Sequence, residues 1–502
     1  MKKIYIATAS PESLQSLLDD IDIETTVEWL PLKDSHPLQW DLRIQDERIA
    51  LVPDRKGMTP PYLMPPLDLS KAAFKSALLL RMGDFAGAVE QLKDQKEARM
   101  HVTAYGAIAM AMPLDPETYA WVTQPAAYGE NGAYYAAHNA AVLQHYLGME
   151  DAEGREAADA MFRRALDNAP NPALYVFTLR QYAAFLTEAG APDQAERLLR
   201  ALDPEELTEP ARYDWQQALL QVCMAQLAAP YDISQINEIK TLLRESLEWE
   251  EQLGNVIRQA MVLADAAHVA LLVNRYSEAL AYINKALKIF QAEGLDEFYA
   301  EAMRKKGEIL YSWAQSGQPQ FYKSALESYQ AALKYYTKDE APYAYADIQH
   351  RLGIIYAEMP IEEKKRGIMA GLSMAAFHEA LEIFTPDRYP YEYAAVCTHM
   401  GNALCRFPKG VHTDNYKKAI QYYEKALDIR TPDMPMERAL TLLNYLEAFW
   451  HIRPENGGLD KQKWEDLRRK VEEILHLVDD PHITKEARRH LRLLDEWCSI
   501  NS

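Results

Sequence analysis

Apolar residues recur at helical spacing along most of the chain, and one short apolar pattern is repeated. It is a hexamer with a central alanine, and it occurs as KALKIF, AALKYY, EALEIF and KALDIR. The alanines at the centre of the four copies are Ala286, Ala332, Ala380 and Ala426, so the copies follow one another at intervals of 46, 48 and 46 residues. A near-constant period of this length predicts stacked structural units, each built from the same few elements.

A second repeated pattern predicts where helices end and begin. Three of the hexamers run on into a threonine, an aspartate and a proline, in TKDEAPYAYA from Thr337, TPDRYPYEYA from Thr385 and TPDMPMERA from Thr431. Proline suits the first turn of a helix because its missing N–H would have no partner there. Threonine and aspartate are preferred at the N-cap position of a helix, where their side chains accept a hydrogen bond from a free backbone N–H. We therefore predict that each hexamer ends one helix, that each proline begins the next, and that Thr and Asp supply the caps.

Within each unit, the first helix carries a glycine and the second carries an aromatic residue three positions before the hexamer alanine. The glycines are Gly307, Gly353 and Gly401, and the pairs are Tyr329/Ala332, Phe377/Ala380 and Tyr423/Ala426. Small residues let two helices approach closely, and residues spaced by three lie on one helix face. The pattern predicts helix pairs with a buried stripe along the second helix.

This order of glycine, tyrosine, alanine and aromatic positions resembles the tetratricopeptide repeat family. The unit at 260–292 matches best, with Leu263, Ala267, Ala279, Ile283 and Ala286 at the family's packing positions and Tyr276 in the turn. Weaker matches at 131–169, 172–204 and 210–253, and a family-like turn at Gly83–Phe85, extend the resemblance over residues 70–450. It implies a mainly all-α fold, a right-handed α-α superhelical solenoid of about seven to nine helix pairs. The later units have longer turns, which lengthen the repeat period to 46–48 residues. In this form the repeats are similar to arrays found beside CHAT-type caspase-like protease domains in bacteria.

The two ends of the chain do not follow the repeat. KKIYIATA and TTVEWLPL are strand-like on either side of a helical SPESLQSLLDDI, and DLRIQDERIALV alternates around Asp46 and Glu47 as a hairpin does. We predict a small α/β module at 1–57, a proline-rich junction at 58–70, divergent helix pairs at 71–253, regular repeats at 254–452 and capping helices at 453–502, of which the two amphipathic segments are 460–478 and 483–498.

The net negative charge of the chain argues against two classes of partner. The 74 Asp and Glu against 54 Lys and Arg give a formal charge of -20, which repels phosphate backbones and anionic lipid, so we expect neither nucleic acid nor membrane as a partner. No stretch reaches the ~18 uninterrupted apolar residues of a membrane span, and the N-terminus lacks the apolar centre of a secretion signal. Four cysteines without a CxxC pair fit a reducing compartment, which predicts a cytoplasmic protein.

Motifs for catalysis and cofactor binding are missing from the sequence. It contains no GxxxxGK[ST], GxGxxG, HExxH or GxSxG. The strand–helix–strand at the N-terminus could begin a nucleotide-binding fold, but its turn, TASPES, lacks the glycines that let phosphate approach a helix N-terminus. We expect no enzyme activity and no cofactor, with catalysis in residues 1–57 as an alternative.

The densest group of metal-ligand residue types is Cys397, His399, Cys405 and His412. Eight residues along a helix turn Cys405 by ~80° from Cys397 and raise it by ~12 Å, so the two thiols would not share a tetrahedral site. We expect buried cysteines that act as small apolar residues, and no metal.

Function is therefore expected on the groove that the first helices line. Counted from the family's glycine, its residues are Arg304, Glu308, His350, Thr398, Asn402 and Arg406. The resemblance implies that an asparagine there grips a peptide backbone and that basic neighbours grip a carboxylate. Asn402 with Arg406 is the comparable pair, and an ordinary solvated face is the alternative.

These features predict a non-enzymatic adaptor, scaffold or regulatory subunit that binds a protein or peptide. The resemblance adds a bacterial signalling or defence complex as a possible setting. A peptide-sensing regulator, whose array changes curvature when a peptide binds, is the alternative from a second class. The repeats predict a mode of binding and leave the partner, the process and the oligomeric state open.

Overall fold

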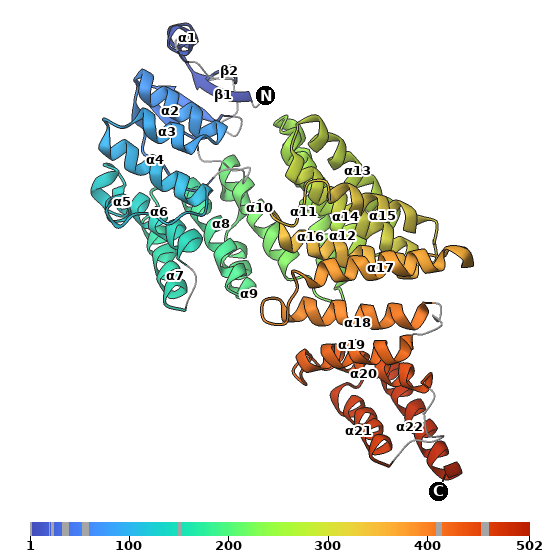
Figure 1. Ribbon diagram of the computed structural model, residues 1–502. Coiled ribbons are helices and arrows are strands. Elements are labelled where there is room, and N and C mark those ends of the chain that lie inside the picture. Colours follow the sequence, from blue (N-terminus) through green and yellow to red (C-terminus); the bar gives the residue numbers. More distant parts are fainter. Residues whose placement is uncertain are drawn as a thin grey trace. The chain divides into compact units, whose positions relative to one another are not determined.

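The computed structural model describes residues 3–19, 21, 25–32, 40–52, 60–148, 152–407, 414–452 and 461–501. The chain forms two compact units, Met1–Val262 and Leu263–Ser502. A small sheet opens the first unit, and helices make up most of the rest of both (Figure 1). The fold is therefore the expected array of tetratricopeptide-like helix pairs with an N-terminal α/β module.

The N-terminal sheet has five strands in the order β2-β1-β3-β4-β5. The strands are β1 (Lys3–Thr8), β2 (Thr26–Pro31), β3 (Leu42–Gln45), β4 (Arg48–Leu51) and β5 (Leu67–Asp68), and helix α1 (Pro11–Asp19) follows β1. β1 pairs in parallel with β2 and with β3, whereas β4 is antiparallel to both β3 and β5. The predicted strand–helix–strand and hairpin are confirmed. β5 adds to the prediction, because two residues just after the prolines pair with β4.

The hairpin between β3 and β4 turns in two residues. Asp46 and Glu47 both have positive φ, 50° and 57°. Two successive left-handed residues form the type I′ turn, whose twist matches that of the strands it joins. The polar pair that the sequence places between the two apolar runs is therefore the turn itself.

In the described part of the first unit, ten complete helices follow the sheet. They are α2 (Lys71–Met82), α3 (Phe85–Gln91), α4 (Lys96–Ala109), α5 (Pro116–Val122), α6 (Gly132–Leu147), α7 (Ala152–Asp167), α8 (Pro172–Glu188), α9 (Pro192–Arg200), α10 (Glu209–Ala225) and α11 (Ile233–Gln252). Each even-numbered helix packs against the odd-numbered helix that follows it. The short helix η2 (Pro125–Ala127) lies between α5 and α6.

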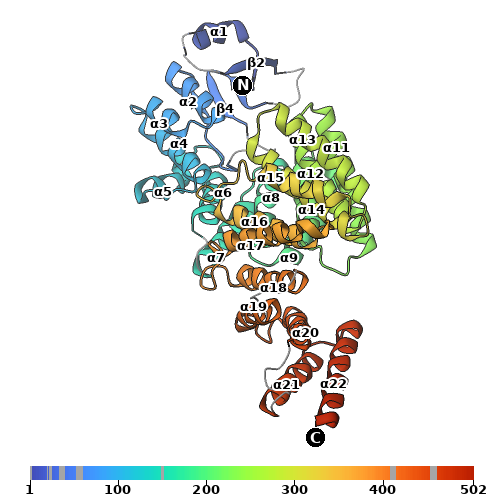
Figure 2. The same cartoon turned by 45° about the vertical axis from the view of Figure 1, so that its right-hand side comes forward.

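Helix α12 (Val256–Leu272) spans the division between the two units, and the second unit is also built of helices. Its helices are α13 (Tyr276–Ala292), α14 (Asp296–Gln315), α15 (Phe321–Ala332), α16 (Pro342–Glu358), α17 (Arg366–Leu381), α18 (Pro390–Arg406), α19 (Asn415–Ile429), α20 (Pro435–Trp450), α21 (Lys461–Leu477) and α22 (Pro481–Asn501). Figure 2 shows α18, α19 and α20 following one another towards α21 and α22. Among the described helices from α2 to α19, eight pairs of consecutive helices pack directly as even and odd partners, which lies within the predicted range of seven to nine.

Prolines begin the first helices of the regular repeats, as predicted. Pro342, Pro390 and Pro435 are the first residues of α16, α18 and α20. The prediction of Thr and Asp caps is wrong for these helices. The capping residues are Ala341, Tyr389 and Met434; all three are described, and none of their side chains makes a capping hydrogen bond. Thr337 instead closes the turn before α16, where its Oγ1 accepts a hydrogen bond from the N–H of Glu340 at 3.2 Å.

In three of the regular repeats, the two helices of a pair approach closely because a glycine of the first helix contacts an aromatic ring of the second. A Cβ built on Gly307, Gly353 or Gly401 would lie 2.9, 2.6 or 2.4 Å from the ring of Tyr329, Phe377 or Tyr423. These rings and the alanines three residues later are buried. The predicted buried stripe is confirmed, and its partner is the bare backbone of the first helix.

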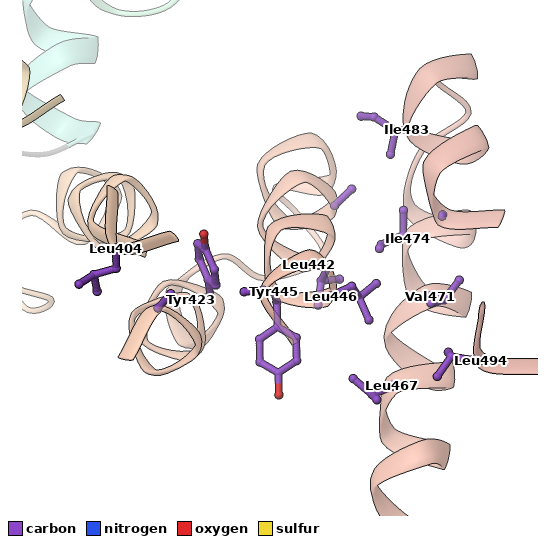
Figure 3. Packing of buried hydrophobic residues seen from close by; sticks show 14 residues of the cluster. Leu404, Tyr423, Leu442, Tyr445, Leu446, Leu467, Val471, Ile474, Ile483 and Leu494 are labelled. Atoms are coloured by element: carbon purple, nitrogen blue, oxygen red, sulfur yellow. The ribbon is translucent and has the colours of Figure 1, made fainter. Parts of the chain in front are cut away.

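Helices α21 and α22 cover α20, and they lie where the two amphipathic segments are predicted. Their buried residues share one cluster with α20 (Figure 3), which includes Leu467, Val471 and Ile474 of α21, Ile483, Ala487 and Leu494 of α22, and Leu442, Tyr445 and Leu446 of α20. The apolar face of α20 is therefore buried under two further helices.

Candidate partner-binding surface

The six residues predicted for the groove lie on three first helices, α14, α16 and α18. Counted from the glycine of each helix, Arg304, His350 and Thr398 hold one equivalent position, Glu308 and Asn402 hold a second, and Arg406 stands five residues after its glycine. Hydrogen bonds and ion pairs join α14 to α16 and α16 to α18. The structure thus brings the six residues onto neighbouring helices, where their side chains have different surroundings.

Arg304 is held by acidic side chains of the array. Its Nε and Nη2 donate to the two carboxylate oxygens of Glu301 at 2.8 and 2.7 Å, and its Nη1 lies 3.7 Å from Asp347 on α16. The hydrogen bonds to Glu301 raise the pKa of Arg304 above its usual value. A bidentate pair of this kind fixes the guanidinium plane, so Arg304 would have to exchange Glu301 for a ligand carboxylate.

Arg406 takes part in a polar network that links all three helices. Its Nη1 donates to Oε1 of Glu358 at 3.1 Å, and Oε2 of the same carboxylate accepts the hydroxyl of Tyr311 at 2.9 Å. Burial and the charge of Glu358 raise the pKa of Tyr311. The side chain of Arg406 nevertheless remains 56% exposed. Of the six residues, it is a cation that a partner could reach without a rearrangement.

His350 lies in the interface between two first helices, not on an open face. It is buried, and its Nε2 is 2.9 Å from Nδ1 of His399 on α18. Burial lowers the pKa of His399 to about 4, and burial together with His399 and Arg351 lowers that of His350 well below its usual value. Both imidazoles are therefore neutral at pH 7, and they form a polar contact between α16 and α18.

The remaining groove residues also have partners inside the array. Oγ1 of Thr398 donates to the carbonyl of Ala394 one turn earlier at 2.9 Å, and Oδ1 of Asn402 accepts the hydroxyl of Tyr423 at 2.8 Å. Glu308 is half-buried and acts to raise the pKa of His268, although burial lowers that pKa overall. Asn402 and Arg406 thus contact different groups, and the clamp that the resemblance implies stays a prediction.

The structure shows a surface feature that the sequence reasoning missed. Large apolar side chains are exposed on α16, α18 and α20, and they include the residue that follows the first proline of each helix. We call Tyr343, Tyr391, Met436 and Leu440 the apolar row; they are 47, 67, 42 and 44% exposed. The signal was in the repeated Pro-Tyr, Pro-Tyr and Pro-Met, which the sequence reasoning used only to mark helix starts.

The cysteine and histidine residues considered for metal have separate surroundings. Cys397 is buried beside Ala394 and Ala426, and burial raises the pKa of its thiol to about 11. Sγ of Cys405 lies 3.8 Å from the hydroxyl of Tyr423, and His412 lies outside the described residues. Over the described ranges, no group of three or more His, Cys, Asp or Glu residues is arranged to hold a metal ion.

The N-terminal sheet carries a pocket of about 1630 Å³ at the carboxyl ends of its parallel strands. Thr8, Ser10, Trp29, Arg43 and Asp46 are among the residues that line it. Ligands of open α/β sheets bind at this edge. The described lining holds no histidine or cysteine, and its two carboxylates belong to the exposed hairpin turn.

Within the described ranges, no helix has both the length and the apolar composition needed to cross a membrane.

Among known proteins, the similarities found for this chain are to solved structures. No family model matches the sequence, and no curated protein matches it. The human IFIT1 dimer with m7Gppp-AAAA is 14% identical with a TM-score of 0.44, over 84% of this chain and 89% of that chain. Yeast Tom70 is 12% identical with a TM-score of 0.36, over 86% and 89%, and the Cut9 complex with Hcn1 is 14% identical with a TM-score of 0.26, over 84% and 89%. Values this low assign neither a family nor a function to the chain.

Proposed function

We propose that this chain is a non-enzymatic scaffold or regulatory subunit that binds a protein partner through the first helices of residues 254–452. The observation that carries the proposal is the apolar row. Three successive first helices each expose a large apolar side chain at the same position, directly after the proline that begins the helix.

An exposed apolar residue alone is ordinary, but a repeated row of them marks an interaction surface. Burying such side chains against a partner removes apolar area from water, and tyrosine in addition brings a hydroxyl for hydrogen bonding. Tyr343 already uses its hydroxyl, which donates to Glu392 on α18 at 2.8 Å. The ring is thereby fixed in position before a partner arrives.

Ordered polar residues elsewhere on the first helices support the same function. Glu301 orients Arg304, and Glu358 holds Tyr311 and Arg406. Side chains that are ordered in the free protein lose less conformational entropy on binding. The exposed, positively charged side chain of Arg406 favours an acidic group on the partner at the C-terminal end of α18.

The setting of the proposed scaffold rests on the sequence resemblance. The long-turn repeats are similar to arrays beside bacterial CHAT-type proteases, so we place the protein in a protease-linked signalling or defence complex in the bacterial cytoplasm. The absence of enzyme activity is part of the proposal as well. IFIT1 was solved with a capped RNA, whereas the charge of -20 of this chain opposes phosphate backbones.

The test is affinity purification from the native cell with two matched double variants. Tyr391→Ala with Met436→Ala shortens the apolar row, and Ile368→Ala with Leu372→Ala removes two exposed apolar residues of α17 that lie outside it. We expect one specific protein to be recovered with the wild type and the α17 variant, and at least about 10-fold less of it with the row variant. Recovery of RNA in place of a protein, or equal recovery by both variants, would overturn the proposal.

A further inference from the structure

A proline-rich segment of this chain lies against the first helices of the first unit as a bound peptide would. We call residues 60–66, PPYLMPP, the strap. Residues 61–64 are buried and have no regular secondary structure. Their polar groups are bound by side chains of α4 and α6, which come later in the sequence. These helices are not the ones that carry the apolar row.

The backbone of the strap is held by two neighbouring residues of α6. Asn139 binds Leu63 twice, because its Oδ1 accepts the N–H of Leu63 and its Nδ2 donates to the carbonyl, both at 2.8 Å. Nδ2 also donates to the hydroxyl of Tyr128 at 2.8 Å, which fixes the orientation of the amide. Nε2 of His138 lies 2.9 Å from the carbonyl oxygen of Pro61.

The histidine contact has one consistent arrangement of hydrogens. Nδ1 of His138 lies 2.9 Å from Oγ1 of Thr178 on α8, whose hydroxyl can donate to it. Nε2 then carries the hydrogen and donates to Pro61. The imidazole is neutral, since burial lowers its pKa to about 4. The helices thus offer a donor, an acceptor and a second donor to three backbone groups of an extended chain.

The side chains of the strap enter separate subsites. The hydroxyl of Tyr62 lies 2.7 Å from Nδ1 of His101 on α4 and 3.2 Å from the hydroxyl of Tyr128, so the phenol is recognised at its polar end. Leu63 packs with Tyr134 of α6 and Phe177 of α8. The helices therefore bind the backbone of Pro61 and Leu63, and they offer a polar pocket to Tyr62 and an apolar pocket to Leu63. Together these contacts define a preference for the sequence Pro-Tyr-Leu.

We propose that this surface of α4, α6 and α8 is a peptide-binding site that the chain's own strap occupies, and that an extended Pro-Tyr-Leu segment of another protein competes for it. Most backbone groups of a protein core find their hydrogen-bond partners within a helix or a sheet ladder. The strap obtains them from side chains on a helix surface, which can serve a separate peptide equally well. The site recognises a neutral tyrosine, because its polar contacts are an uncharged imidazole and a second phenol.

Competition from the tethered strap sets the size of the expected effect. A segment on a short connection acts at an effective concentration on the order of 1 mM. For a peptide with an intrinsic dissociation constant of about 10 µM, this weakens binding in trans on the order of 100-fold. Wild-type protein should therefore bind a free peptide poorly, and opening the strap should reveal the site.

The experiment measures binding of a fluorescein-labelled peptide, PPYLMPPL, to the full chain. The open-strap variant carries Tyr62→Ser and Leu63→Gly, which remove both side-chain anchors. We expect it to bind the peptide at least 10-fold more tightly than the wild type. Adding Asn139→Ala to that variant should abolish the gain, and a peptide with alanine in place of its tyrosine should bind at least 10-fold more weakly than the parent peptide.

Two further measurements separate a strap that is only structural from one that can be exchanged. Circular dichroism reports whether the open-strap variant is folded, and the peptide should raise its melting temperature without changing that of the wild type. If that variant does not fold, Tyr62→Phe keeps the ring and removes only the hydroxyl bond, and it should still bind the peptide several-fold more tightly than the wild type. Equal affinity of folded variant and wild type, or a gain that survives Asn139→Ala, would overturn the proposal.

Discussion

At the scale of single residues, the contact of a glycine with an aromatic ring determines how closely two helices pack. A Cβ on Gly353 would lie 2.6 Å from Cδ1 of Phe377, whereas a Cβ on Gly371 of α17 meets no atom within 4 Å. Both glycines lie inside helices. We expect Gly353→Ala to lower the free energy of unfolding by about 1–3 kcal/mol through overpacking.

The matched change Gly371→Ala should raise it by about 0.5–1 kcal/mol, because alanine is the better helix former and has room there. Urea unfolding followed by circular dichroism measures both. A Gly353→Ala variant as stable as the wild type would show that the pair can separate without cost.

Buried histidines give the stability of this protein a pH dependence that can be worked out residue by residue. Burial lowers the pKa of His101, His138 and His399 to about 4, whereas an imidazole in the unfolded chain titrates near 6.5. Between these values the unfolded state binds more protons, so stability rises with pH. The contribution is full above about pH 6.5 and is lost as the pH falls towards 4.

We therefore expect the free energy of unfolding to drop from pH 6.5 to pH 5.5, by up to about 1.4 kcal/mol for each such histidine. This interval lies above the titration range of ordinary carboxylates. Melting temperatures at pH 7.5, 6.5 and 5.5 measure the effect, and His399→Gln, which cannot take up a proton, should make the slope shallower. The exposed His378→Gln is the control, and an equal change of slope in both variants would contradict the assignment.

The sequence predicted which residues are buried better than it predicted what the polar residues contact. Small and aromatic positions follow the helical period, so the stripes around Ala332 and Ala380 could be predicted from spacing alone. The partners of the groove residues come from other helices: Asn402 contacts Tyr423, and His350 contacts a residue 49 positions away. Periodicity fixes the face of a helix that a residue occupies, but the side-chain conformation that selects a partner depends on the neighbouring repeat.

At the scale of elements, the hairpin of the N-terminal sheet contains a turn that its sequence does not favour. Asp46 and Glu47 both have left-handed φ values, and such a turn prefers Asn or Asp followed by Gly. Glutamate pays a steric cost of about 1 kcal/mol in this region, and glycine does not. We expect Glu47→Gly to raise the stability of the sheet by about 0.5–1 kcal/mol, with slower hydrogen exchange of the amides in β3 and β4.

Glu47→Ala is the control for the loss of the side chain, and it should bring no gain, because alanine keeps the Cβ. The hydrogen bond from the N–H of Leu69 to the carbonyl of Glu47, 2.7 Å long, involves only backbone atoms and is available to all three chains. Equal stabilisation by glycine and alanine would mean that charge, not backbone conformation, determines the effect.

Local sequence also explains which elements could be predicted. The hairpin and the proline-initiated helices carry their signals within a few residues, and both were predicted. β5 carries almost none, because it is two residues long and its partner β4 is about 20 residues away. The strap was predicted only as a junction, since its role depends on Asn139 and His138, which lie more than 70 residues away.

At the scale of the whole molecule, a repeat array has an exposed apolar face wherever its last pair is left uncovered. In the second unit α21 and α22 bury Leu467, Val471 and Ile474 against α20, and all three side chains are fully buried. Each helix pair contacts only its neighbours, so the stability of α20 depends on this cover. Loss of the cover should therefore propagate into the preceding repeats.

We expect Val471→Ala with Ile474→Ala to lower the free energy of unfolding by about 2–5 kcal/mol, because both truncations leave cavities in a closed cluster. The control on the same helix is Glu472→Ala, which removes an exposed ion pair with Arg468 of 3.1 Å and should change stability by less than about 1 kcal/mol. Hydrogen exchange followed by mass spectrometry shows how far the effect spreads: protection should fall first in α20 and α19 and less in α14. A loss confined to α21 and α22, with α20 unchanged, would show that the array ends at α20 without needing its cap.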